Sequence, residues 1–268
     1  KIQVQLVFAD DSLKVDFTGS GAQSSSHFNA GLGIVQAAVL YFVRVMLADD
    51  MPMNSGALRP LQWIVPRGVL NPDFSVELSK RPAVAAGNVE TSQRIVDVLL
   101  GAMGQCGASQ GTMNNLLLGN QSFGFYETIG GGAGATRQGP GAAAVHTHMT
   151  NTRLTDPEVL ERRYPLKLRR LEIRHGSGGN GLHNGGDGMI REIECLSDLE
   201  VSLITSRRSP YAPFGQQGGE AGQSGQNFLI DRSGIARQLP SSIQLSVKAG
   251  ERIRLETPGG GGFGVPAT

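Results

Sequence analysis

Two histidines separated by one residue, His146 and His148, have the side chains and the spacing for acid–base or metal chemistry. On a β-strand, residues two apart point to the same face, so both imidazoles would face one site. The nearest preceding carboxylate is Glu127, and no third ligand stands beside the pair. One structural histidine and one half-exposed histidine explain the pattern equally well, and both interpretations stay open.

A glycine-rich run at residues 130–134 follows Glu127 closely. Glycine lets the backbone approach a ligand, and its N–H groups can bind an oxyanion or a phosphate. The run is not a P-loop, because no Gly-Lys-Ser/Thr follows it, and no βαβ unit surrounds it as a dinucleotide site requires. A structural turn or close strand packing explains the same glycines.

Side-chain amides form a third polar group, at residues 110–115, which include Asn114. An amide can hold a carboxylate or a ring amide by hydrogen bonds, although asparagine also forms ordinary turns. Asn151 and Thr152 have the same two interpretations. A nucleophilic cysteine has no support, because neither Cys106 nor Cys195 has a histidine near it in the sequence.

The composition excludes several classes of partner. The 268 residues carry 24 basic and 23 acidic side chains, a net charge of +1, so we expect no nucleic-acid partner and no binding to an anionic membrane. The most apolar stretch, residues 33–47, is too short to span a bilayer and contains Arg44. Two distant cysteines predict free thiols and a cytoplasmic location. The chain starts at Lys1 inside a strand-like pattern, and we expect it to be part of a longer protein.

The elements that must position these residues differ between the two parts of the chain. Alternating apolar residues at 2–8 and 13–17 predict a β-hairpin, and 61–65 reads as a strand. Residues 33–47 predict a helix that is packed on most of its surface. A second helix, with apolar positions from Ile95 to Met103, is expected to start at an Asn88 cap.

From about Gly104 the chain becomes rich in glycine and short strands. A helical turn is expected at 156–164, followed by a strand at 166–174 with a β-bulge at Arg169-Arg170. Further strands are predicted at 189–194, 199–205, 227–230, 243–247 and 252–256. We therefore predict a mixed α+β fold, with a hairpin and helix part at 1–105 and a glycine-rich, β-rich part at 106–268, arranged as a sandwich or a barrel.

Several long motifs resemble the hydantoinase B/oxoprolinase family, in matching order and spacing over nearly the whole chain. They are GNVETSQRIVDVLLGA (87–102), ASQGTMNN (108–115), FYETIGGGAGA (125–135), VHTHMTNTRLTDPEVLERRYP (145–165), LRRLEIRHGSGGNG (168–181), GGDGMIREIE (185–194) and LETPGGGGFG (255–264). The resemblance is closest to the C-terminal part of the oxoprolinase branch.

The resemblance implies a chemistry. Family members open a cyclic amide, 5-oxoproline or a hydantoin, with ATP, and a separate hydantoinase A-type ATPase module phosphorylates the amide oxygen. We therefore expect the C-terminal part of an ATP-dependent hydrolase, most simply one that converts 5-oxo-L-proline to L-glutamate. The alternatives are an N-methylhydantoinase-type B subunit, a carboxylase subunit of the acetone or acetophenone type, and a non-catalytic scaffold. We expect the isolated chain to be inactive and the complete enzyme to be oligomeric.

The matching motifs also suggest site residues. Glu127 and His148 are the candidates for a general base or a water-orienting group, and His146 is the second choice. Gly131 and Gly132 would supply backbone donors, and Asn114, Asn151 and Arg153 would hold polar groups of the substrate. Family members are longer at the N-terminus, where we expect the metal ligands. ATP and Mg2+ are therefore expected to bind outside this chain, which is predicted to hold no metal.

Overall fold

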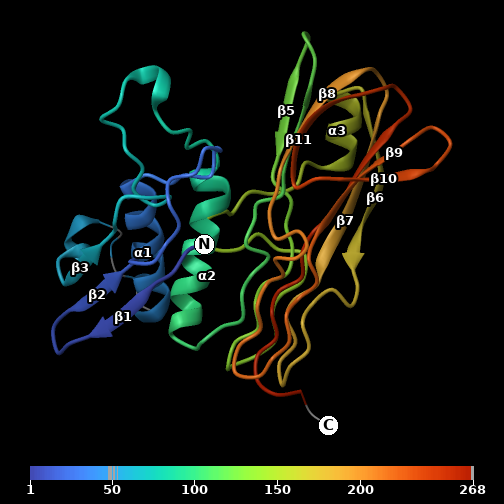
Figure 1. Ribbon diagram of the computed structural model, residues 1–268. Coiled ribbons are helices and arrows are strands. Elements are labelled where there is room, and N and C mark those ends of the chain that lie inside the picture. The colour runs from blue at the N-terminus through green and yellow to red at the C-terminus, as the bar shows by residue number, and fades with distance from the viewer. Residues whose placement is uncertain (48–49, 51, 53, 267–268) are drawn as a thin grey trace. The chain divides into compact units, whose positions relative to one another are not determined.

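The computed structural model describes residues 1–47, 50, 52 and 54–266. The chain divides into two compact units, Lys1–Gln105 and Cys106–Thr268 (Figure 1). The division falls where the glycine-rich composition begins. None of the helices that the structure describes is both long enough and apolar enough to cross a membrane.

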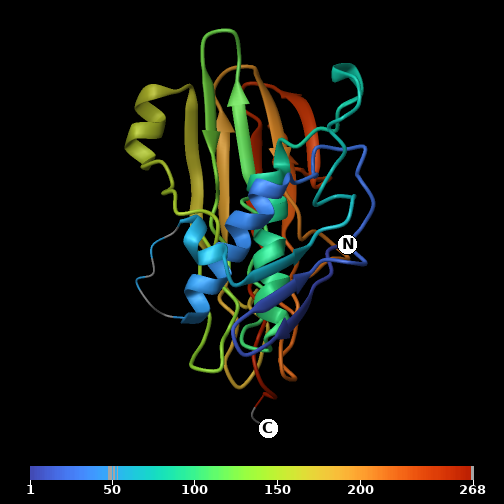
Figure 2. The ribbon, with the colours of Figure 1, turned by 90° about the vertical axis from the view of Figure 1, so that its left-hand side faces the viewer.

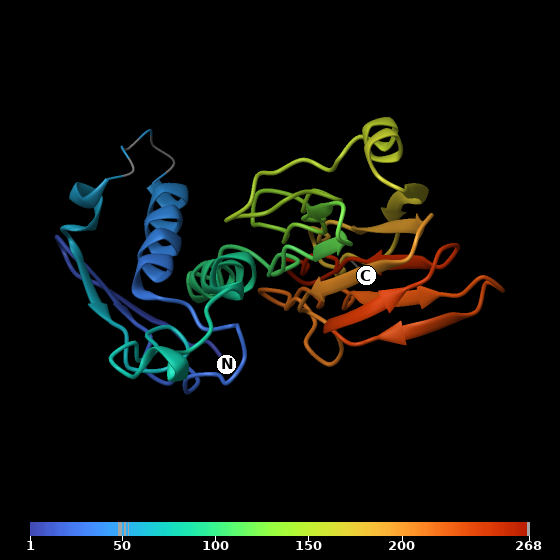
Figure 3. The same ribbon diagram turned by 90° about the horizontal axis from the view of Figure 1, so that it is seen from above.

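The first unit is a three-stranded sheet with two helices on one side of it (Figure 3). The predicted hairpin is confirmed as β1 (Gln5–Phe8) and β2 (Leu13–Asp16), and the predicted third strand as β3 (Leu61–Ile64), which pairs in parallel with β2. The helices are α1 (Leu32–Leu47) and α2 (Ser92–Ala102), with 3-10 turns at Ser55–Leu58 and Leu78–Lys80.

Helix α1 forms where it was predicted, but it is not packed on most of its surface. Its buried side chains are one stripe, Val35, Ala38, Val39 and Phe42, while Leu47 is 58% exposed. The spacing of the four buried residues is that of a single helical face. The apolar composition of the other faces was therefore a poor guide to burial.

Helix α2 also starts differently from the prediction. A π-helical turn, Gly87–Thr91, precedes it, so Asn88 lies inside this turn and does not cap the helix. The side chain of Ser92 donates a hydrogen bond to the carbonyl of Asn88, which helps to close the wider turn. The predicted apolar face is confirmed, because Ile95, Val96 and Leu99 are fully buried.

The second unit contains a sandwich of two antiparallel sheets, and not a barrel. The five-stranded sheet has the order β10-β9-β12-β7-β6, and the four-stranded sheet has the order β11-β8-β4-β5. The strands are β4 (Asn115–Gly119), β5 (Gly124–Glu127), β6 (Leu166–Arg174), β7 (Gly188–Cys195), β8 (Leu199–Ile204), β9 (Gln226–Ile230), β10 (Ala236–Leu239), β11 (Ser242–Val247) and β12 (Arg252–Glu256).

The sandwich core comes from the apolar residues that alternate along these strands. Leu116, Leu203 and Ile253 are among the fully buried members, and Leu160 joins them from helix α3 (Pro157–Arg163). Helix α3 lies beside β6 (Figure 2). The predicted bulge is confirmed by a register shift between Leu168 and Arg170. The alternation thus predicted six strands of this unit, but it missed β10 and the β4–β5 hairpin.

Extended segments that run below the strands of the second unit in Figure 1 form a layer held by backbone hydrogen bonds. We call it the glycine layer and define it as residues 107–110, 131–136, 141–145, 177–188, 213–223 and 258–263. The backbone of Gly260 donates to the Gly186 carbonyl at 2.8 Å and accepts from Gly179 at 2.9 Å. A Cβ atom at Gly260 would lie 1.9 Å from the Ala133 oxygen. Only glycine permits so close an approach of two backbones.

Candidate functional site

Glu127, the last residue of β5, is buried in the sandwich, where it forms an ion pair. The Nε atom of Arg191 lies 2.7 Å from Oε2 of Glu127, and Nη2 of Arg191 donates to Oε1 at 3.2 Å. The backbone N–H of Thr155 donates to the same Oε1 at 2.6 Å. Oε1 therefore accepts two hydrogen bonds, whereas Oε2 has no hydrogen bond in the described part of the chain and contacts the Arg191 guanidinium as an ion pair. With a buried guanidinium against it, Glu127 is poorly placed to take a proton from water.

Sequence reasoning missed Arg191, although a signal was present. Arg191 lies in β7 between Met189 and Ile193, at an alternate position that points to the core, and it is fully buried. Burial lowers the pKa of the Arg191 guanidinium, and the charge of Glu127 opposes this effect. A charged residue at a core position of a strand predicts a buried counter-charge, because an unpaired one is too costly.

Next to Glu127 three side chains form what we call the His146 cluster: Thr128, His146 and Thr152. The two threonine hydroxyls are 2.5 Å apart, and Oγ1 of Thr152 lies 3.4 Å from Nε2 of His146. Burial lowers the pKa of His146, which keeps its imidazole neutral near pH 7. Its Nδ1 atom is buried and has no hydrogen-bond partner in the part of the chain that the structure describes. A neutral imidazole with an uncommitted nitrogen can act as a general base.

The structure does not place His148 beside His146 on a strand. Residues 146–150 are outside any strand, and His148 has φ 51°, in the left-handed region. The strand that would have put both imidazoles on one face is therefore absent, and the spacing of the two histidines no longer carries that expectation. His148 remains half-buried, and its catalytic role stays a prediction.

Asn151 and Arg153 flank Thr152 and are exposed. The hydroxyl contacts of Thr152 therefore bring both residues into the neighbourhood of His146. The segment continues into Leu154, which packs against the sandwich core, and Thr155, which is held by Glu127. Two exposed polar side chains thus lie on a segment that is held between them, at Thr152, and after them, at Leu154 and Thr155.

The backbone donors of Gly131 and Gly132 are not free. The N–H of Gly131 donates to the Val145 carbonyl at 3.0 Å, and the N–H of Gly132 donates to Pro258 at 2.9 Å. A Cβ at Gly132 would lie 1.9 Å from the Gly186 oxygen. This geometry gives close packing as the reason for the two glycines and offers no N–H group of theirs to an oxyanion.

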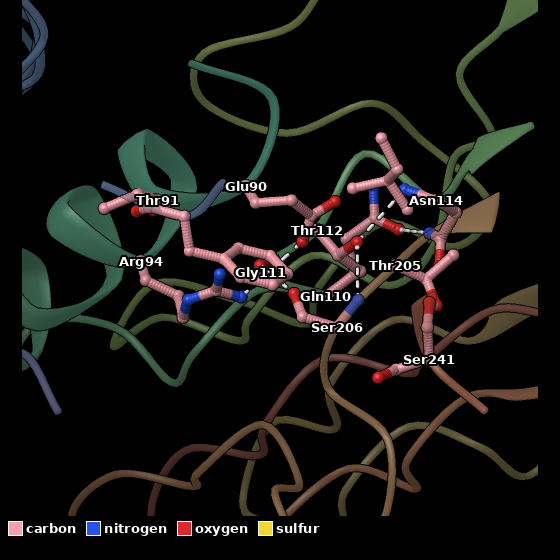
Figure 4. Close-up of polar contacts among 12 residues, drawn as sticks. Glu90, Thr91, Arg94, Gln110, Gly111, Thr112, Asn114, Thr205, Ser206 and Ser241 are labelled. Carbon is pink, nitrogen blue, oxygen red and sulfur yellow. Dashed lines mark hydrogen bonds and ion pairs between the residues drawn. The ribbon is translucent and has the colours of Figure 1, made fainter. Parts of the chain in front are cut away.

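Asn114 is also occupied by internal contacts. It is fully buried with φ 45°, and its amide donates to Oε1 of Gln110 at 2.7 Å and to the Ile129 carbonyl at 3.1 Å (Figure 4). Both terminal nitrogens of Arg208 donate to its side-chain oxygen at 3.1 Å. A substrate contact by Asn114 would have to replace one of these bonds.

A Gly-x-Ser-x-Gly pattern at residues 107–111 also escaped the sequence reasoning. In a nucleophile elbow this pattern sits on a sharp turn between a strand and a helix. Here it lies outside strands and helices, and Ser109 is buried, with its hydroxyl accepting from the N–H of Gly111 at 3.1 Å. The serine is not presented as a nucleophile.

Two kinds of group could hold Mg2+ or a phosphate, namely a cluster of metal-ligating side chains and the glycine N–H donors. Across residues 1–47, 50, 52 and 54–266, no three or more His, Cys, Asp or Glu side chains are grouped closely enough to hold a metal ion. The N–H groups of Gly131 and Gly132, which a phosphate would need, are used in the glycine layer.

The sequence model of the family described as hydantoinase B/oxoprolinase matches residues 1–266. 5-oxoprolinase 1 of Arabidopsis thaliana is 46% identical over 93% of this chain and 19% of its own length. 5-oxoprolinase of Dictyostelium discoideum is 42% identical over 98% of this chain and 21% of its own length. The chain thus spans about a fifth of these relatives.

A solved structure has the same fold. The ATP-dependent caprolactamase from Pseudomonas jessenii superposes with a TM-score of 0.84 at 22% sequence identity. The alignment covers 98% of this chain and 48% of that one. Both units therefore have counterparts within one longer chain.

Proposed function

Because the chain belongs to the hydantoinase B/oxoprolinase family, we propose that it forms part of an ATP-dependent hydrolase that converts 5-oxo-L-proline into L-glutamate. The observation that carries the proposal is the identity of 46% and 42% to two proteins named 5-oxoprolinase, extending over 93% and 98% of the chain. An identity of this size over nearly every element supports a shared reaction more strongly than a shared fold does.

Opening the ring requires a proton to move twice. A water oxygen bonds to the amide carbon and loses a proton, then the ring C–N bond breaks and the nitrogen gains a proton. A neutral imidazole with a free nitrogen can take the first proton and return it to the leaving nitrogen. We assign this role to His146, because its pKa is lowered by burial and its Nδ1 atom has no partner in the described part of the chain.

The neighbours of His146 have supporting roles in this proposal. Asn151 and Arg153, exposed on the fixed segment, are placed to bind the carboxylate or the ring amide of the substrate. In this proposal Glu127 supports that segment and is not the base, since Oε1 accepts the N–H of Thr155 and Oε2 faces the buried Arg191 guanidinium. His148 is the alternative base and is tested beside His146.

The rest of the reaction belongs to the complete enzyme. ATP, bound with Mg2+ on a hydantoinase A-type ATPase module, would supply a phosphoryl group to the amide oxygen and so make the ring carbon more reactive toward water. Cleavage of the C–N bond would then leave an acyl phosphate, and a second water would release phosphate from it to give the carboxylate of L-glutamate. That module is the partner we propose, within an oligomer. The two cysteines of this chain form no disulfide bond, which fits a reducing compartment such as the cytoplasm.

The test follows glutamate release from 5-oxo-L-proline by the complete enzyme, with and without ATP. Glutamate that appears only with ATP is the expected result, and the isolated chain should release none. Parallel reactions with a hydantoin and with acetone plus bicarbonate separate the alternatives. Turnover of the hydantoin alone, or uptake of bicarbonate, would reject 5-oxoproline as the substrate and keep the family.

Variants of the complete enzyme test the site. His146→Gln should lower kcat by about 100-fold or more, as expected for loss of a general base. The matched control is His175→Gln, because the side chain of His175 is 85% exposed, and its kcat should be unchanged. A normal kcat for His146→Gln together with a large loss for His148→Gln would move the role to His148.

A further inference from the structure

The ion pair of Arg191 and Glu127 lies at an unusual place for two charges. The side chains of both residues are almost completely buried, at 0% and 2% exposed. Arg191 shares the core face of β7 with Met189 and Ile193, and it is opposite Leu255 of β12. An apolar pair of similar volume would serve the stability of such a core at least as well. The pair therefore calls for a reason beyond packing.

The contacts of Glu127 supply that reason. The oxygen that accepts from Nη2 of Arg191 also accepts from the backbone N–H of Thr155, at 2.6 Å. Three residues earlier, Thr152 contacts the hydroxyl of Thr128, the residue that follows Glu127 in the chain. The segment 152–155 is thus held at both ends by two consecutive residues at the end of β5.

The same segment reaches the imidazole. The hydroxyl of Thr152 is the group beside Nε2 of His146, at 3.4 Å. A rotation of Glu127 would release Thr155 and loosen the segment that carries Thr152. The planar guanidinium of Arg191 opposes this rotation, because Nη2 donates to Oε1 while Nε lies in ion-pair contact with Oε2. The single nitrogen of a lysine could not make both contacts in this geometry.

We propose that Arg191 is a positioning residue for the reaction: acting through Glu127, it fixes segment 152–155 and thereby the orientation of the His146 imidazole. The catalytic meaning of this role rests on the function proposed above, in which His146 transfers the proton. The positioning itself does not, because the orientation of the imidazole can be measured without turnover.

The direct test is a titration of the five histidines by NMR in residues 1–268 carrying ¹³C-labelled histidine, with His146→Gln used to assign the signal. Arg191→Lys keeps the charge but loses the two-oxygen geometry. If the segment loosens, His146 becomes more hydrated and its midpoint moves up toward the ordinary value of about 6.5. The matched control is Arg252→Lys, which alters an ion pair of 2.8 Å with buried Glu192 in the same sheet and should leave the midpoint unchanged.

A second variant keeps the test decisive if Arg191→Lys does not fold. Thr155→Pro removes the backbone donor that Glu127 holds and leaves the buried ion pair intact. It should move the His146 midpoint in the same direction. An unchanged midpoint in a folded Arg191→Lys chain, or in Thr155→Pro when the first does not fold, overturns the proposal.

The complete enzyme separates this inference from the proposed function. Arg191→Lys should lower kcat about 10- to 100-fold with little change in KM, since a small misplacement of a catalytic group has that cost. The pKa that governs the acidic limb of the kcat–pH profile should also rise, together with the NMR midpoint of His146. A shifted midpoint with normal kcat would retain the positioning role and reject His146 as the base.

Discussion

Replacing Gly260 by alanine tests whether the glycine layer is as tightly packed as its geometry implies. A Cβ at this position would lie 1.9 Å from the carbonyl oxygen of Ala133, which also accepts a hydrogen bond of 2.9 Å from Gly186. Ordinary contact distance would require the two backbones to separate by about 1.5 Å. A separation of that size breaks the bond from Gly186 and strains the neighbouring bond from Gly260.

The magnitude follows from these contacts. Overpacking a well-filled region costs about 1–3 kcal/mol, and each lost hydrogen bond adds about 1 kcal/mol. The obstructing atom belongs to the backbone, so no side chain can swing away. We therefore expect Gly260→Ala to lower the free energy of unfolding by about 3 kcal/mol or more, which is about 6–12 °C in Tm for a unit of this size.

Urea unfolding followed by far-UV circular dichroism and tyrosine fluorescence measures this change, because Tyr126, Tyr164 and Tyr211 all lie in the second unit. The control is Gly124→Ala in β5, where an added Cβ meets nothing within 4 Å. The control should differ from the wild type by less than about 0.5 kcal/mol. Equal midpoints for the two variants would show that the layer opens freely and would refute the reasoning.

Three further predictions concern the same unit. Leu160→Ala should cost about 3 kcal/mol in urea unfolding, since Leu160 is fully buried, whereas Val159→Ala, at a 39% exposed position, should cost less than about 0.5 kcal/mol. Burial lowers the pKa of His146 in the folded state below the unfolded value of about 6.5, so between the folded pKa and pH 6.5 the unfolded state binds more protons than the folded state. The free energy of unfolding of the wild type should therefore fall more than that of His146→Gln as the pH is lowered from about 6.5 through the folded pKa. Burial raises the pKa of Cys195 to about 12, so a thiol reagent at about pH 8 should modify only Cys106 in the folded chain, and a second thiol that reacts at the same rate would contradict this.

Alternation of apolar residues predicted most of the second unit, because a half-buried strand must repeat with a period of two. It located the bulge at Arg169 as well, since an extra residue shifts the alternation by one. It failed at Ala236–Leu239, where three of the four residues of β10 are exposed and no apolar period exists. Periodicity detects burial on one face, so it misses a strand that buries almost nothing.

The candidate site was less predictable for a different reason. The motifs placed His146, Asn151 and Arg153 in one stretch of sequence, and the structure keeps them in one neighbourhood. The fixed role of Glu127 was out of reach, because it depends on Arg191, which is 64 residues away along the chain. Glycine content is compatible both with close backbone packing and with ligand binding, and the hydrogen-bond partners of Gly132 distinguish the two.

The position of residues 259–262 has a consequence for how the second unit is made. Synthesis on the ribosome runs from the N-terminus, so the segments around Ala108, Ala135, Gly179 and Gly186 emerge before the segment that joins them. Until then the backbone groups that pair with residues 260 and 261 have no permanent partner. The glycine layer of the second unit should therefore fold only after residues 259–262 have been synthesised, and in a single step. A ribosome stalled before Gly259 should carry a chain that proteases cut readily within the glycine layer.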